Sequence, residues 1–92
     1  MTYYVAVGAK GEAIVTTSPE ARDEQLQADG CNMTAGELRE FGLRNPGVPR
    51  YWATTEHESF DELRDYLRDA APEILGDKDR ERWVETALAD VL

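Results

Sequence analysis

Residues 59–72 read SFDELRDYLRDAAP, and this stretch decides the fold expected for the chain. Its apolar residues recur at helical spacing and share one face of a helical wheel. They are Phe60, Leu63, Leu67, Ala70 and Ala71. Ser59 and Glu62 match a capping box at the start, and Pro72 cannot continue the helix because it lacks a backbone N–H. The pattern therefore predicts an amphipathic helix between Ser59 and Pro72 that buries its apolar face.

A second amphipathic helix is expected after Gly76. Asp77 is a candidate N-cap, because its carboxylate can accept hydrogen bonds from the free N–H groups of a first helical turn. The apolar stripe that follows consists of Trp83, Val84, Ala87, Leu88 and Val91. We expect this helix and the one after Ser59 to supply most of the core.

Strand patterns lie upstream of these helices. Residues 2–9 alternate with a period of two, and residues 13–17 are rich in β-branched side chains. The turn residues 8–11 between them predict a hairpin. A third strand is expected over residues 50–55, and Pro49 before it favours a position at the edge of the sheet.

Two further helices are expected between the second and third strands. Ser18 followed by a proline starts a helix over residues 19–28, whose thin apolar face predicts a peripheral position. Thr34 and Glu37 form a capping box before a short helix over residues 35–43.

The expected element order is therefore β-β-α-α-β-α-α in a single domain of residues 1–92. Hydrophobic residues make up 41% of the chain and charged residues 32%, which is typical of globular domains. This order predicts an α+β fold in which the helices pack on one face of a three-stranded, mainly antiparallel sheet.

Net charge and cysteine content limit which classes of partner the protein can bind and which cellular compartment suits it. Nineteen acidic and ten basic residues give a net charge of −9, which repels nucleic acid phosphates and anionic membranes. No apolar run approaches the roughly 18–20 residues of a membrane span, and the first residues lack the basic region of a signal peptide. Cys31 is the single cysteine and cannot form an internal disulfide. We therefore expect a cytoplasmic monomer or homodimer with no membrane partner and no direct nucleic acid partner.

The acidic excess is concentrated near the C-terminus, since residues 1–55 carry seven acids and five bases while residues 56–92 carry twelve acids and five bases. Asp61, Asp65 and Asp69 recur every four residues, and Glu62 lies beside them on the polar side of the predicted helix. Like charges at this spacing disfavour a helix by roughly 0.2–0.5 kcal/mol per pair. Arg64 and Arg68 can relieve part of the repulsion by pairing with Asp61 and Asp65. Two interpretations stay open: a solvated helix face, or a row that mimics nucleic acid phosphates.

Arg50, Tyr51 and Trp52 are a second candidate partner-binding site. Arginine, tyrosine and tryptophan are the residue types most enriched at interface hot spots, and an edge strand could present them to a partner. The alternative is structural: Trp52 packs under the helices and Tyr51 covers the sheet.

Catalytic and metal-binding patterns are weak in this chain. His57 lies between Glu56 and Glu58, but alternate residues in one loop lack the ligand spacing of a closed metal site. Cys31 with His57 would make a thiol dyad, which separation of the two residues in the fold would exclude. We therefore expect no enzymatic activity, no metal and no cofactor.

In size, acidity and mixed α/β build, the whole chain resembles small phage-encoded anti-CRISPR proteins, several of which act as DNA mimics on Cas surfaces. The resemblance lies in these general properties and not in a shared motif, so it assigns no functional residue. Bacterial immunity proteins and antitoxins are similarly small and acidic, and composition does not separate these groups.

These observations lead to one expected function and its alternatives. The expected function is inhibition, in which the acidic surface covers a basic surface of a nucleic acid-binding protein, such as a Cas effector subunit in a bacterial host cell. The alternatives are an immunity or antitoxin-like protein, and a domain whose acidity is an adaptation to high salt. Acids spread evenly over every surface would support the salt adaptation.

Overall fold

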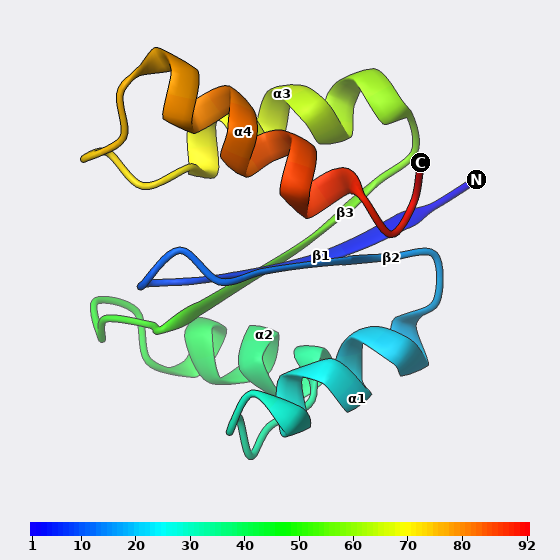
Figure 1. Ribbon diagram of the computed structural model, residues 1–92. Helices are drawn as coiled ribbons and strands as arrows, with labels where there is room; N and C mark the ends of the chain where they lie inside the picture. The colour runs from blue at the N-terminus through cyan, green and yellow to red at the C-terminus, as the bar shows by residue number, and fades with distance from the viewer.

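The computed structural model describes residues 1–92 and has the expected order of elements (Figure 1). The strands are β1 (Tyr3–Gly8), β2 (Ala13–Thr16) and β3 (Trp52–His57), and the helices are α1 (Pro19–Ala28), α2 (Ala35–Arg44), α3 (Phe60–Ala70) and α4 (Asp77–Leu88). The α+β class and the order β-β-α-α-β-α-α are thus confirmed. The third strand begins and ends two residues later than the sequence pattern predicts.

The three strands form one antiparallel sheet in the order β2-β1-β3. Val5 of β1 lies opposite Val15 of β2 and Thr55 of β3, so β1 is the central strand. Its turn to β2 contains Gly11 at φ 90°, a conformation that favours glycine. The predicted edge position of the third strand is confirmed.

The helices cover both faces of the sheet, so the expectation that they pack on one face is wrong. Figure 1 shows α3 and α4 on one side of the sheet and α1 and α2 on the other. The cause lies in β1, where Val5, Ala6 and Val7 are all buried. Successive strand residues point to opposite faces, so a central strand that is apolar at every position needs cover on both sides.

Each face of the sheet has its own hydrophobic core. The core under α3 and α4 contains Val5, Val7, Val15, Leu63, Leu67, Val84 and Leu88. The core under α1 and α2 contains Ala6, Ile14, Leu26, Ala35 and Trp52. The helix over residues 19–28 is therefore not peripheral, because Leu26 fills the centre of the second core.

The helix starts follow the predicted caps in part. The capping box of Thr34 and Glu37 is complete. In α3 the Ser59 hydroxyl accepts a hydrogen bond from the Glu62 N–H, but the Ser59 N–H donates none to the Glu62 carboxylate. Asp77 is not an N-cap, because the cap residue is Gly76. Asp77 lies in the first turn, where its negative charge interacts favourably with the positive N-terminal end of the helix dipole. None of the four helices combines the length and the apolar composition that crossing a bilayer requires.

Candidate partner-binding surfaces

The acidic face of α3 consists of Asp61, Glu62, Asp65 and Asp69, and all four side chains are exposed. The opposite side of the helix is fixed to the sheet by Leu63 and Leu67, both fully buried. The sequence placed these acids on one polar helix side, and the structure confirms that position. A rigid helix therefore presents four carboxylates to solvent.

The arginines of α3 neutralise only one of these carboxylates. Arg68 lies 3.7 Å from Asp65 and also donates to Glu81 of α4 at 2.9 Å, so it bridges the two helices. Arg64 does not pair with Asp61 as expected, because its guanidinium lies over the Phe60 ring, 4.9 Å from the centroid. The remaining members of the acidic face, at positions 61, 62 and 69, have no cationic side chain within ion-pair distance.

The excess of acidic residues is larger in one helical layer than in the other. Residues 60–92, which form the α3–α4 layer, carry ten acids and five bases. Residues 17–50, which form the α1–α2 layer, carry six acids and four bases. The net charge is therefore −5 in the α3–α4 layer and −2 in the α1–α2 layer.

Of the three residues of the predicted site, Arg50 and Tyr51 are exposed and Trp52 is buried. Trp52 is only 6% exposed and belongs to the second core, so it is not an exposed hot-spot residue. Tyr51 is 43% exposed, packs edge-on against the Trp52 ring and donates its hydroxyl hydrogen to the Glu12 carboxylate. Arg50 is exposed and makes no ion pair.

The hydrogen bond between Tyr51 and Glu12 moves the two pKa values apart. It stabilises the carboxylate and so lowers the pKa of Glu12 below 4.5. The same bond stabilises the phenol and raises the pKa of Tyr51 above 10.0. Glu12 also accepts from the Lys10 N–H at 3.0 Å, so this carboxylate ties the hairpin turn to the segment that leads into β3.

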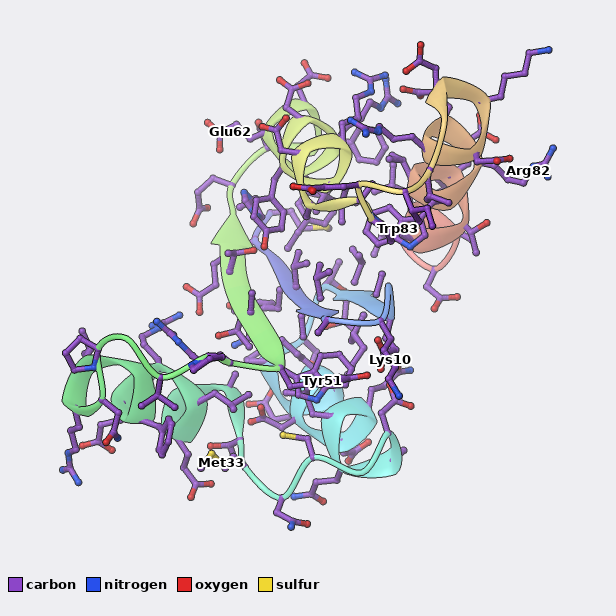
Figure 2. The ribbon with its side chains drawn as sticks, turned by 90° about the vertical axis from the view of Figure 1, so that its left-hand side faces the viewer. Lys10, Met33, Tyr51, Glu62, Arg82 and Trp83 are labelled. Carbon is purple, nitrogen blue, oxygen red and sulfur yellow. The ribbon has the colours of Figure 1, made fainter.

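A pocket of about 510 Å³ opens beside Arg50, between the α1–α2 loop, α2 and the start of β3. Its apolar lining comes from Cys31, Met33, Leu38, Phe41, Pro49 and Trp52. Figure 2 shows Met33 and Tyr51 in the half of the molecule that contains α1 and α2. Sequence reasoning missed this pocket, because its lining comes from three separate segments and no spacing rule joins them.

Two of the exposed apolar side chains, Phe41 and Tyr51, line the same pocket. Apart from the terminal residues Met1 and Leu92, the large exposed hydrophobic residues are Phe41, Leu43, Val48, Tyr51 and Ile74. All but Ile74 lie within residues 41–51. A contiguous apolar patch on a protein surface often marks a binding site, whereas single exposed apolar residues are normal.

The fold separates the residues that could have formed a catalytic or metal site. His57 lies on the α3–α4 side, where its ring contacts Tyr66 with centroids 4.8 Å apart, while Cys31 packs against the core on the other side. The thiol dyad is therefore excluded. Glu56 points away from His57 and pairs with Arg22 and Arg39 at 3.8 and 3.5 Å, and no group of three metal-ligating side chains occurs in the chain.

Arg22 is a buried polar residue that the sequence did not reveal. Its guanidinium lies beneath the sheet, donates to the Thr55 carbonyl at 3.1 Å and lies over the Tyr4 ring at 5.3 Å. Burial lowers the pKa of Arg22, and the nearby charge of Glu56 partly opposes this shift. Arg22 thus holds α1 to the sheet and is not available to a partner.

No family model matches the sequence, and no curated protein or solved structure matches it either. Two surfaces nevertheless stand out by their chemistry: the acidic face of α3 and the pocket beside Arg50. They belong to opposite layers of the molecule, with Glu62, Arg82 and Trp83 in one half of Figure 2 and Met33 in the other.

Proposed function

We propose that this protein inhibits a nucleic acid-binding protein by covering its basic surface with the acidic face of α3. The observation that carries the proposal is that Asp61, Glu62 and Asp69 are exposed and lack a cationic partner on a helix whose other side is fixed in the core. The carboxylates of Asp61, Asp65 and Asp69 rise about 6 Å per step along the axis, comparable with phosphates along one strand. Asp65 pairs with Arg68, so the unpaired ends of the row, Asp61 and Asp69, lie about 12 Å apart along the axis. Arginine and lysine side chains that bind phosphates would accept such a row.

The distribution of charge supports a directed surface over a general adaptation to salt. A salt adaptation places acids on every surface, whereas here the net charge is −5 in the α3–α4 layer, residues 60–92, and −2 in the α1–α2 layer, residues 17–50. The concentration of acids on one layer is what a protein needs in order to orient itself toward a basic partner.

The bridge from Arg68 to Glu81 adds to this support. It connects α3 to α4 while it neutralises only Asp65, so the remaining carboxylates stay available on a fixed scaffold. A preorganised surface loses less conformational entropy when it binds. Anti-CRISPR-like action on a Cas effector subunit and antitoxin-like action on a nuclease both fit this mode.

The test compares the parent with a variant that neutralises Asp61, Asp65 and Asp69 as asparagines. Each immobilised protein is exposed to bacterial lysate at low and high salt, and purified Cas effector complexes are assayed separately for binding to labelled target DNA. We expect the parent to retain basic proteins at low salt and to reduce DNA binding, and the triple variant to lose both effects. The fold should keep about the same stability, because the removed repulsion of roughly 0.2–0.5 kcal/mol per pair is offset by the loss of the Asp65–Arg68 ion pair and of the favourable charge of Asp61 in the first turn.

A matched control removes three exposed, unpaired acids that lie outside α3. Glu24→Gln, Glu73→Gln and Asp90→Asn together change the net charge by the same amount. This control should still inhibit. If the parent and the α3 variant bound a partner equally well, with the same dependence on salt, the acidic face would be a solvated surface only.

A further inference from the structure

Arg50 lines the pocket, and its guanidinium packs against helix α2. Its guanidinium lies directly against Gly42, a buried glycine of that helix, and a side-chain methyl group there would clash with Cζ and Nη1 of Arg50. The absence of a side chain at position 42 therefore makes room for the guanidinium beside Phe41 and Leu38, which line the same pocket.

The charge of Arg50 is not neutralised by the chain itself. Four of the eight arginines, at positions 22, 39, 44 and 68, pair with carboxylates, and Arg50 is one of the four that pair with none. Among those four, Arg50 alone lines this pocket. Its position near the last turn of α2 favours a cation, because the C-terminal end of the helix dipole is negative. The pocket thus combines apolar walls with one free, forked donor group, the typical composition of a small-molecule site.

We propose that this pocket binds a small organic anion, a carboxylate carried on an apolar ring or chain. Arg50 would bind the carboxylate, and Met33, Leu38, Phe41 and Trp52 would surround the apolar body. The volume of about 510 Å³ lies within the range of roughly 300–1,000 Å³ for small-molecule pockets. The site belongs to the α1–α2 layer and is independent of the function proposed for α3.

Asp29 provides a test of the sign of the ligand charge. It lines the same pocket and would repel an anion. Asp29→Asn should therefore strengthen the binding of an anion, whereas it would weaken the binding of a cation. An anion bound more weakly by this variant would contradict the proposal.

The experiment uses two probes with the same phenylbutyl skeleton, 4-phenylbutanoate, which ends in a carboxylate, and 4-phenylbutan-1-ol, which ends in a neutral hydroxyl. Nuclear magnetic resonance titrations follow the Met33 methyl and Trp52 indole signals of the full chain. We expect saturable shifts with the acid and about tenfold weaker binding of the alcohol, as the loss of a charge-assisted hydrogen bond implies. Equal affinities for the acid and the alcohol, or no shifts with either, would overturn the proposal.

A pair of glycine variants tests the geometry without removing the charge. Gly42→Ala should displace the guanidinium and weaken binding of the acid about tenfold, whereas Gly36→Ala on the same helix, with its nearest neighbouring atom 3.9 Å away, should leave it unchanged. Both variants should melt no lower than the parent, because alanine is the better helix former. Binding that is unaffected by Gly42→Ala would refute the role of this contact.

A pair of arginine variants tests the charge itself. Arg50→Gln should weaken binding of the acid to the level of the alcohol. Arg82→Gln changes an exposed arginine of the opposite layer that likewise makes no ion pair, and should have no effect. Equal losses in the two variants would show that net charge, and not the pocket, determines binding.

Discussion

At the scale of single residues, the hydrogen bond from Tyr51 to Glu12 makes a pH-dependent contribution to stability. The pKa of Glu12 is lowered by folding, so the contribution of Glu12 to stability is present above pH 4.5. This contribution is lost as the pH falls through the folded-state pKa. The pKa of Tyr51 is raised by folding, so the contribution of Tyr51 to stability is present below pH 10.0. This contribution is lost as the pH rises through the folded-state pKa. We expect Tyr51→Phe to lower the melting temperature by a constant amount across neutral pH, and by less at both extremes.

The matched control for this prediction is Tyr3→Phe. The Tyr3 ring packs against Phe60 on the other side of the sheet, and its hydroxyl makes no hydrogen bond. Its melting temperature should therefore differ from that of the parent by an amount that does not depend on pH between 4 and 9. A Tyr51→Phe difference that stayed constant into strong acid would contradict the assignment.

Residue-level predictions from sequence were most accurate where local chemistry decides, although the Ser59–Glu62 box is only half formed and Asp77 is not an N-cap. They failed where tertiary contacts decide. The capping box at Thr34 needs only a neighbour three residues away, so the sequence was sufficient. The sequence left two interpretations of Trp52 open, and the structure has the buried one, with Leu26 and Ile14 from other elements as its partners. The burial of Arg22 depends on carbonyls of two strands. No local pattern indicates such partners.

At the scale of elements, the two cores predict two independent sets of destabilising changes. Leu67→Ala and Leu88→Ala in the first core, and Leu26→Ala in the second, should each lower the free energy of unfolding by about 2–5 kcal/mol. Leu67→Ala and Leu26→Ala lie on opposite sides of the sheet and share no partner, so their effects should add. Denaturant unfolding measures each value.

The control for these changes is Leu43→Ala, since Leu43 lies on α2 with 78% of its side chain exposed. It should change the free energy of unfolding by less than about 0.5 kcal/mol. A Leu26→Ala variant that melted like the parent would mean that the second core contributes little, and that α1 is peripheral after all.

The helices were easier to predict than their arrangement. Helical periodicity and caps are properties of a short stretch, so α1 matches its predicted residues 19–28 and α3 ends before Pro72 as expected. Helices lie on both faces because β1 is apolar at successive positions, so both of its sides need cover. A search for period-two alternation assigns the strand but does not show that both of its sides are buried. The acidic face of α3 could be predicted because it lies within one helix, whereas the pocket beside Arg50 required the whole fold.

At the scale of the whole molecule, the net charge of −9 opposes the compact state, because ten of the acids lie on one layer. Five ion pairs act against this repulsion, and most of their side chains are largely exposed, so each contributes only about 0–1 kcal/mol. Salt weakens both effects, since the Debye length falls from about 10 Å at 0.1 M to about 3 Å at 1 M. Their balance determines the sign of the salt dependence.

We expect the repulsion to dominate, so that the melting temperature rises as sodium chloride increases from 10 mM to 0.5 M. The variant with asparagine at positions 61, 65 and 69 should gain less melting temperature from added salt than the parent, since three closely spaced like charges are gone. At low salt its melting temperature should stay close to that of the parent, because the Asp65–Arg68 pair and the first-turn charge of Asp61 are lost as well. The control variant at Glu24, Glu73 and Asp90 loses the same net charge without relieving that spacing, and its gain from salt should fall between the two. Thermal melts followed by circular dichroism measure all three proteins. A melting temperature that fell with salt would show that the ion pairs, led by Arg68 with Glu81, outweigh the repulsion within the α3–α4 layer.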